Sequence, residues 1–365
     1  MIDGAQTLPN GDIISLTDMA SVNSTASDNV RAPLLHHTLS RDGVRTSLRT
    51  VSHFPPTSPE RVHRTTPLLL AVFSWWHLYY AVDFLVAASL WGASTWTSRL
   101  KPYQRAINPL DPDVHRKYHA GDIIPMSLVT SITIAVPLLT CLSYHLLLLI
   151  SRCGHDYYIP ANRAMKKHLV RESLAYVLHD THHLVLALFL ATGATKVMTD
   201  LFKVWMGRFR PDFLDRCQFD NAILECTGEH KLIRDGRESW PSGHTSASFC
   251  GMGLVSLYLA GKLSAWCVDE PPYGGRVFSL VLSVMPLIGA AYIGISRTEE
   301  NKHHPTDVLS GAVLGFAIAY ISYRLLYPSV FSGNRKLMKK PKGFSETSGY
   351  VTFDGENGQV PNPNA

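Results

Sequence analysis

The sequence predicts an all-α, polytopic membrane protein with six transmembrane helices. Two observations support this fold class. The middle of the 365-residue chain holds six long apolar segments, and a helix needs about 20 mostly apolar residues to cross a bilayer. The mean hydropathy of the whole chain is only +0.03, because polar segments at both ends dilute the apolar middle. The expected spans are residues 67–92, 123–150, 181–202, 244–268, 277–296 and 307–327.

Both ends of the chain differ in composition from this middle part. Residues 1–66 and 328–365 are rich in Ser, Thr, Pro, Gly and Asn and lack a periodic apolar pattern. Such segments bury too little apolar surface to offset the entropy lost on ordering. We therefore predict a disordered N-terminal tail at 1–66, one membrane domain at 67–327 and a disordered basic tail at 328–365.

Two expected spans contain charged residues. The first holds Asp83, to which the sequence assigns no role, but the apolar stretches on both sides of it are long. The third holds Lys196 and Asp200 four positions apart, a spacing that puts both charges on one helix face, where they can neutralise each other. A soluble helical bundle is the alternative, and runs such as HLLLLI and LVLALFLA argue against it because they lack a polar face.

The basic residues predict the orientation of the spans. Six spans put both termini on one side of the membrane, together with the basic segments RAMKKHLVR and NRKLMKKPK. The bias of Lys and Arg toward the cytosol therefore predicts cytosolic termini. The net charge of +5 is scattered and accompanies no nucleic-acid-binding motif, so we expect a membrane and no nucleic acid as partner. The sequence leaves the oligomeric state unknown.

The six cysteines show neither C-x-x-C pairs nor zinc spacing. We therefore predict no metal site and no cofactor. Cys217 and Cys226 fall in the expected loop at 203–243, on the lumenal or extracellular side, where they either form a disulfide or stay free thiols.

Three charged stretches are expected on that same side: KVWMGRFRP, WPSGH and SRTEENKHHPTD. Guanidinium groups suit phosphate oxygens, and Ser242 and Gly243 at a helix start would present backbone N–H groups to an anion. Together the stretches predict an anion site, although each alone is compatible with headgroup contacts and an ordinary helix cap. The cations without an equal set of carboxylates beside them in sequence are Lys203, Arg208, Arg210 and Arg297.

The third stretch has two candidate nucleophiles. Pro305 favours a helix start there, and Asp307 follows His303 by four positions and His304 by three. A nucleophilic imidazole needs one free ring nitrogen, while the other nitrogen donates its proton to an acceptor such as a carboxylate. The spacing permits either histidine.

These residues resemble the three-part signature of the type 2 phosphatidic acid phosphatase superfamily, the integral-membrane lipid phosphate phosphatases. GRFRPDFLDRC and PSGHTSASF resemble the branch of lipid phosphate phosphatases and diacylglycerol pyrophosphate phosphatases in particular. The resemblance covers roughly residues 75 to 327. The matching motifs, with every position present, are Lys203-x6-Arg210-Pro211, Pro241-Ser242-Gly243-His244 and Ser296-Arg297-x5-His303-x3-Asp307.

The resemblance implies the helical bundle of that family and a role for each signature residue. His303 would be the nucleophile, Asp307 would orient it and His244 would protonate the leaving group, while His304 receives no defined role. The implied ligands of the phosphoryl oxygens are Lys203, Arg210, Ser242, Gly243 and Arg297.

The implied activity is magnesium-independent dephosphorylation of phosphatidate, lysophosphatidate or diacylglycerol pyrophosphate through a phosphohistidine. The implied location is a vacuolar, endoplasmic-reticulum, Golgi or plasma membrane, with the site on the lumenal or extracellular side. Glu299 and Glu300 depart from the usual family pattern and add negative charge near the expected anion site. The alternatives are a lipid phosphotransferase of the sphingolipid synthase type, a phosphatase for isoprenoid or sphingoid phosphates, and a non-enzymatic protein of the same fold.

Overall fold

Long α-helices make up most of the described chain, in agreement with the predicted fold class. The computed structural model describes residues 76–156, 163–267 and 275–331, and the side chains among them except at 152–172. The expected N-terminal tail, the first part of the first expected span and most of the expected C-terminal tail lie outside the described residues. Residues 328–331 are described, and Val330 is fully buried against the helical core.

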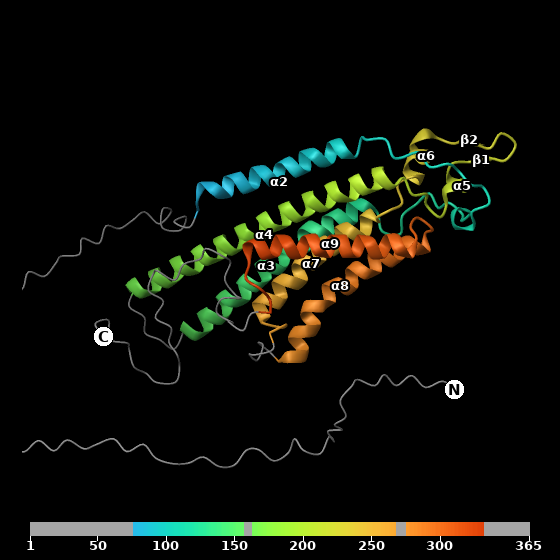
Figure 1. Ribbon diagram of the computed structural model, residues 1–365. Helices are drawn as coiled ribbons and strands as arrows, with labels where there is room; N and C mark the ends of the chain where they lie inside the picture. The colour runs from blue at the N-terminus through green and yellow to red at the C-terminus, as the bar shows by residue number, and fades with distance from the viewer. Residues whose placement is uncertain (1–75, 157–162, 268–274, 332–365) are drawn as a thin grey trace, which may run out of the picture. The chain divides into compact units, whose positions relative to one another are not determined.

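In the described part of the chain, six long helices follow one another in alternating directions along the bundle (Figure 1). Smaller elements gather at one end of them: the 3₁₀ helix η1 (Pro112–Val114), helices α5 (Phe213–Arg216) and α6 (His230–Gly236), and strands β1 (Phe219–Asp220) and β2 (Glu225–Cys226). The two strands pair antiparallel. The long helices are α2 (Leu78–Thr97), α3 (Met126–Asp156), α4 (Arg163–Met206), α7 (Gly243–Leu263), α8 (Arg276–Glu299) and α9 (Pro305–Leu326).

Four described segments are long and apolar enough to cross a bilayer: 126–151 in α3, 173–206 in α4, α8 and α9. The protein is therefore an integral membrane protein. Helices α2 and α7 are not among the four, so the count of six spans stays a prediction. In α2 the described part includes Tyr79, Tyr80 and Asp83, while the apolar residues 67–75 lie outside the described residues.

Helix α7 occupies the centre of the bundle. It packs against α3, α4, α8 and α9, and most of its residues are buried. A Cβ added to Gly251 would lie 2.8 Å from Thr133 Cα, so a glycine at this position lets α7 and α3 pack closely. Its buried residues combine small ones such as Gly251 with large apolar ones such as Leu254 and Leu257.

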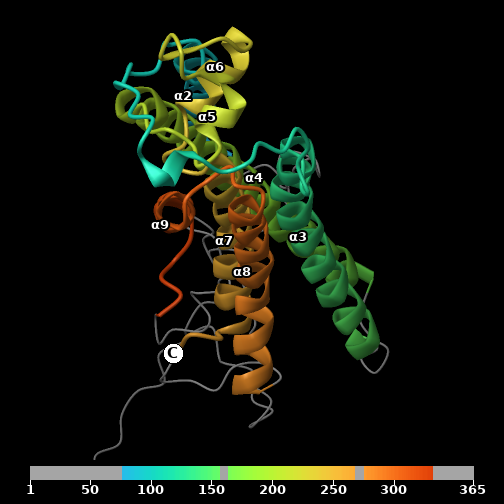
Figure 2. The same ribbon diagram turned by 90° about the vertical axis from the view of Figure 1, so that its right-hand side faces the viewer.

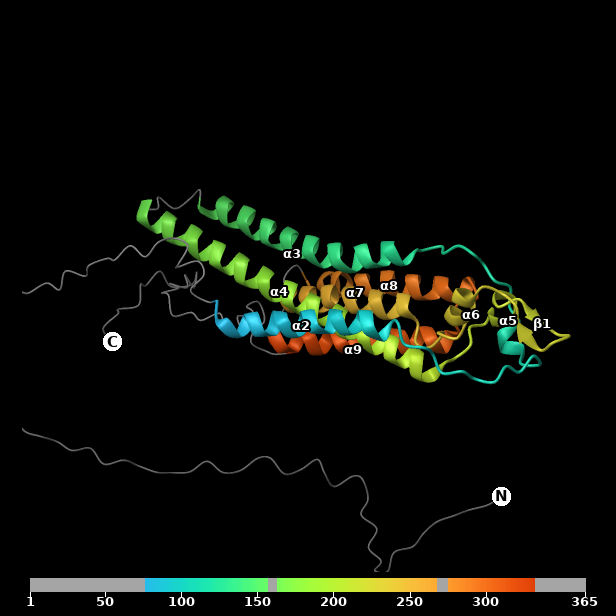
Figure 3. The same ribbon diagram turned by 90° about the horizontal axis from the view of Figure 1, so that it is seen from above.

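The helices extend beyond the expected spans. Helix α4 continues to Met206, so Lys203 lies in its last turn and not in the loop that we expected to begin there. Helix α8 likewise continues to Glu299 and includes Arg297. The expected loop at 151–180 is mostly helical, and α4 extends well beyond α7 and α9 at the end opposite α5 and α6 (Figure 3). Hydropathy marks the apolar part of a helix, whereas good helix formers such as Lys, Arg and Ala extend it past the hydrocarbon.

The predicted start of the last helix is correct. Helix α9 begins at Pro305, whose fixed φ and missing N–H suit the first helical position. Asp307 accepts a hydrogen bond from the His304 N–H at 3.0 Å and thereby caps the helix. This cap fixes the carboxylate at the same end of the bundle as the C-termini of α4 and α8.

Candidate active site

The three motif stretches meet at the end of the bundle that carries α5 and α6. They come from the end of α4, the start of α7 and the turn between α8 and α9. The Ser242 N–H donates to the Asp307 backbone oxygen at 3.0 Å, and Arg210 Nη1 donates to the Lys302 backbone oxygen at 3.5 Å. Residues more than 60 positions apart therefore share one site.

A cavity of about 590 Å³ opens at this junction. Its volume lies in the range of small-molecule sites. Ser242 and Asp307 are fully buried and do not line the cavity. The signature residues that line it are Lys203, Arg210, Gly243, His244, Arg297 and His303.

Asp235 holds Arg210 in place. Arg210 Nη2 donates to Asp235 Oδ1 at 2.8 Å, and Arg210 Nε donates to the Asp235 backbone oxygen at 2.9 Å. Burial would raise the pKa of Asp235, but Arg210 and Arg216 outweigh burial and lower it. The guanidinium is thus oriented before any ligand binds.

Arg297 is buried between two carboxylates. Its Nη2 lies 3.0 Å from Asp122 Oδ1, and its Nη1 lies 2.6 Å from Glu300 Oε2. Lys302 also contacts Asp122. Burial would raise the pKa of Asp122, but the hydrogen bonds and charges of Lys302 and Arg297 outweigh it and hold the pKa at about 2.

In the folded chain, three of the four cations that lack an equal set of carboxylates beside them in sequence are nevertheless paired with a carboxylate. Arg208 pairs with Asp307 at 2.7 Å and does not line the cavity. Arg210 and Arg297 are paired as described. The partners Asp122, Asp235 and Asp307 approach from other parts of the sequence. Of these four cations, only Lys203 has no ion-pair partner in the part of the chain that the structure describes.

Gly243 is the first residue of α7 and faces Lys203. A Cβ added there would lie 3.6 Å from the Lys203 ammonium nitrogen. Ser242 is the N-cap residue, but it makes no side-chain capping bond, and its hydroxyl accepts from Thr245 at 2.9 Å. Because the Ser242 N–H is used by Asp307, the N–H groups of the first helical turn after it are the ones available to an anion.

The two histidines have different surroundings. His304 Nδ1 lies 3.2 Å from Asp307 Oδ2, whereas His303 Nδ1 lies 3.8 Å from the same atom. His303 nevertheless lines the cavity, and His304 does not. Burial, aided by Arg210 and Lys203 and opposed by Asp307, lowers the pKa of His303 to about 3. His303 is therefore kept neutral.

Sequence reasoning missed the residues that hold the signature side chains. Ser239 donates to Asp307 Oδ2 at 2.6 Å and is fully buried. Asp122 and Asp235 hold Arg297 and Arg210 as described. Asp122 and Ser239 lie in loops and Asp235 in the short helix α6, and a single sequence gives no periodicity or motif that could have singled them out.

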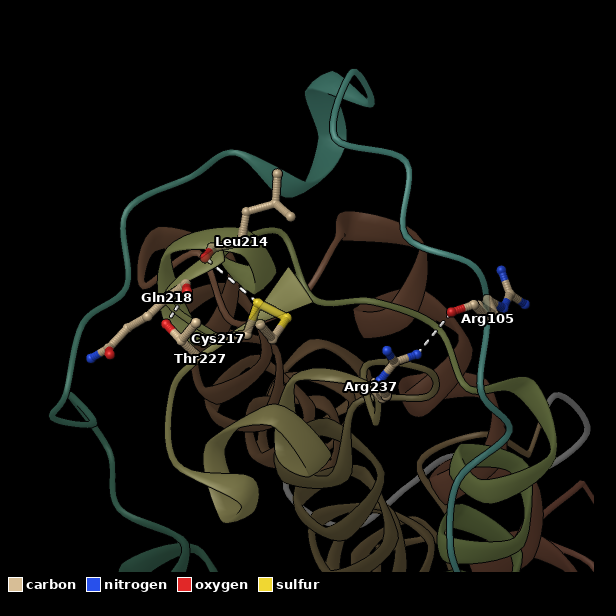
Figure 4. Close-up of a disulfide and its surroundings, with 7 residues drawn as sticks. Arg105, Leu214, Cys217, Gln218, Thr227 and Arg237 are labelled. Atoms are coloured by element: carbon tan, nitrogen blue, oxygen red, sulfur yellow. Dashed lines mark hydrogen bonds between the residues drawn. A yellow bond between two sulfur atoms is a disulfide. The ribbon is translucent and has the colours of Figure 1, made fainter. Parts of the chain in front are cut away.

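A disulfide between Cys217 and Cys226 closes the loop beside the site (Figure 4). Thr227 donates to the Gln218 backbone oxygen at 2.8 Å across the same hairpin. Arg237 Nη1 donates to the Arg105 backbone oxygen at 2.9 Å and ties this loop to the segment after α2. The segment that carries Asp235 is thus fixed on both sides.

One group of possible metal ligands lies elsewhere. Cys141, His145 and Asp180 have ligand atoms within 4.8 Å of one another and are all buried. Lys262 donates to Asp180 Oδ1 at 2.8 Å, and Tyr258 donates to Asp180 Oδ2 at 2.7 Å. Because an ammonium already neutralises the carboxylate, this group is better suited to joining α3, α4 and α7 than to binding a cation.

Fold and site together define a helical membrane protein with a cationic, histidine-bearing pocket at the ends of its helices. Residues 184–330 match the PAP2 superfamily. The chain is 31% identical over 280 residues to "Probable lipid phosphate phosphatase 4" of Arabidopsis thaliana, an alignment that covers 72% of this chain and 79% of the relative. The chain belongs to the PAP2 superfamily.

Two further relatives match over a shorter region. "Lipid phosphate phosphatase 2" of Arabidopsis thaliana is 39% identical over 159 residues, 41% of this chain and 53% of the relative. "Diacylglycerol pyrophosphate phosphatase 1" of Saccharomyces cerevisiae is 36% identical over 171 residues, 42% of this chain and 57% of the relative. The chain thus spans about half the length of these relatives. No solved structure matches it significantly.

Proposed function

We propose that this protein is a phosphoric monoester hydrolase that removes phosphate from membrane lipid phosphates such as phosphatidate, lysophosphatidate and diacylglycerol pyrophosphate. The observation that carries the proposal is the shared cavity: six signature residues line it, and it continues between helices able to cross a bilayer. A lipid could thus keep its chains among the helices while its phosphate lies among the cations. The names of the relatives support the same substrate class.

In the first chemical step, the His303 Nε2 lone pair attacks phosphorus and the bond from phosphorus to the lipid oxygen breaks. His244 gives that oxygen a proton, so the lipid leaves as an alcohol from a monoester, or as phosphatidate from diacylglycerol pyrophosphate. The depressed pKa of His303 supports this role because the attacking imidazole must be neutral. The separation of 3.8 Å between His303 Nδ1 and Asp307 Oδ2 would shorten when substrate binds, as catalytic hydrogen bonds often do.

In the second step, water attacks the phosphohistidine. His244, now neutral, takes a proton from that water as the phosphorus–nitrogen bond breaks, and free phosphate leaves. Burial and the charge of Arg297 disfavour protonated His244, so the first step relies on the negative charge of the bound phosphate to favour it. One histidine thereby serves as acid and then as base.

The charges that the chain itself supplies support the proposed magnesium independence. Lys203, Arg210 and Arg297 line the cavity, and the first turn of α7 adds backbone N–H groups. Phosphoryl transfer depends mainly on positioning and on stabilising charge on the equatorial oxygens. The nearby carboxylates Asp122 and Glu300 are engaged by Arg297, which makes them poor ligands for a divalent ion.

We further propose that the termini are cytosolic and that the site faces the lumen or the exterior. The disulfide beside the site supports this orientation, because disulfides persist in oxidising compartments.

The test is release of free phosphate from dioctanoyl phosphatidate by the purified full chain in detergent, with and without EDTA. We expect equal rates under both conditions, and radiolabelled phosphate trapped on His303. A new phosphodiester in place of free phosphate would instead identify a lipid phosphotransferase, and loss of activity in EDTA would refute the metal-free mechanism.

A further inference from the structure

The cavity continues past the phosphate site into the membrane-spanning part of the bundle. Its deeper wall is built by one face of α4 and one face of α3, and α3 slants away from α7 and α8 in Figure 2. Lys196 and Asp200 lie on the α4 face of this wall. The wall is otherwise rich in hydroxyl groups, from Thr130, Thr133, Thr192, Thr195 and Thr199.

Lys196 and Asp200 form an ion pair inside a segment apolar enough to cross a bilayer. Lys196 Nζ lies 2.5 Å from Asp200 Oδ2, which confirms the pairing predicted from their spacing. The side chains are 42% and 12% exposed, respectively. Charged groups in a span are costly against lipid and mark substrate pathways. Because both line the cavity, the exposed part of Lys196 is accessible to a ligand.

The distance of Lys196 and Asp200 from the phosphate site matches the distance of the glycerol backbone from the phosphate in a lipid phosphate. Lys196 precedes Lys203 by seven residues, which is about 10 Å along a helix. Its ammonium pairs with Asp200 and therefore leans toward the phosphate site. When the phosphate lies at Lys203 and Arg210, the pair lies at the level of the backbone and first ester group of a glycerolipid.

Lys196 is also the suitable hydrogen-bond donor at this depth. Thr192 donates its hydroxyl to the Leu188 backbone oxygen at 2.6 Å, and Thr130 donates to the Met126 backbone oxygen at 2.9 Å. These hydroxyls leave only oxygen lone pairs for a ligand. An ammonium has three N–H donors, and the bond to Asp200 uses one of them.

We propose that Lys196 and Asp200 form a second subsite that binds the oxygen-bearing backbone of acylglycerol phosphates, with Lys196 donating to an ester carbonyl and Asp200 holding the ammonium in place. The proposal rests on the proposed lipid phosphatase function and narrows its substrate class. Isoprenoid phosphates have only hydrocarbon at this depth, so they gain nothing from the pair.

The test compares three substrates of the purified full chain: dioctanoyl phosphatidate, farnesyl phosphate and the small aryl ester p-nitrophenyl phosphate. The variant Lys196→Met/Asp200→Leu removes both charges and keeps similar volumes, which avoids leaving one buried charge unpaired. Lys101→Met is the matched control, because Lys101 is exposed outside the cavity. Thermal unfolding in detergent monitors folding.

We expect kcat/KM for dioctanoyl phosphatidate to fall about tenfold to a hundredfold in the double variant, as for loss of a hydrogen bond to a charged group. Values for farnesyl phosphate and the aryl ester should stay within about threefold of the unmodified protein. An equal loss on all three substrates, or no loss on phosphatidate, refutes the subsite alone. An unmodified protein that hydrolyses none of the three refutes the proposed function, and the subsite with it.

Discussion

Replacing Gly243 with alanine should separate catalysis from stability. The added Cβ meets nothing closer than the Lys203 ammonium nitrogen at 3.6 Å, with the next atoms at 4.0 Å, so the fold has room for it. A phosphoryl oxygen bound to that ammonium would lie about 2.8 Å from it and would have to share this space with the methyl group. We expect kcat/KM to fall by about 10² to 10³, the usual effect of losing one aimed electrostatic donor.

The assay pairs phosphate release with thermal unfolding in detergent. Gly289→Ala is the matched control, because a Cβ there meets nothing within 4 Å and Gly289 lies on α8 away from the cavity. It should keep full activity and gain about 0.5 to 1 kcal/mol of stability from helix propensity. Gly243→Ala with normal activity, or with lost activity explained by a fall in unfolding temperature, would refute the placement of the phosphate between Lys203 and the start of α7.

Three further predictions concern the histidines and the disulfide. His303→Ala should abolish phosphate release and the phosphoenzyme, whereas His304→Ala should retain both at a reduced rate; a phosphoenzyme that persists in His303→Ala would contradict the assignment. The pKa of His303 is about 3 in the folded protein and about 6.5 in the unfolded chain. At a pH between these two pKa values, the His303 imidazole is therefore protonated in the unfolded chain and neutral in the folded protein. Lowering the pH from 7.5 to 5 should therefore destabilise the unmodified protein by on the order of 2 kcal/mol more than His303→Asn, and equal pH dependence of unfolding in both proteins would disprove the neutral, buried imidazole. Cys217→Ala/Cys226→Ala opens a loop with a sequence separation of 9 residues and should cost about 2 to 3 kcal/mol in stability, measured as earlier thermal unfolding; an unchanged unfolding temperature would show that the loop is held by other contacts.

Much of the fold could be predicted because its determinants are local. Apolar runs identify the helices, Pro305 begins α9, and the spacing of Lys196 and Asp200 gives their ion pair. Helix ends were predicted less well. Lys203 and Arg297 fall in last helical turns, because helices continue past the hydrocarbon, and a hydropathy pattern does not report where they stop.

The supporting residues of the site could not be predicted because their contacts are non-local. Asp122 reaches Arg297 across 175 positions and Ser239 reaches Asp307 across 68. A carboxylate or hydroxyl in a loop has many possible partners, and only the packed helices select one. Spacing also left His303 and His304 equivalent, whereas the cavity distinguishes them.

The carboxylates around the cations bear directly on how the site would bind phosphate. Asp235 contacts one edge of the Arg210 guanidinium, and Asp122 and Glu300 contact Arg297. Each carboxylate lowers the net positive charge, and each also fixes a flexible side chain in one orientation. Electrostatic catalysis depends on charges that need no reorganisation as the reaction proceeds. Lys203 has no ion-pair partner among the described residues, so no carboxylate competes directly with the phosphate for its ammonium, while the arginines contribute mainly through fixed geometry.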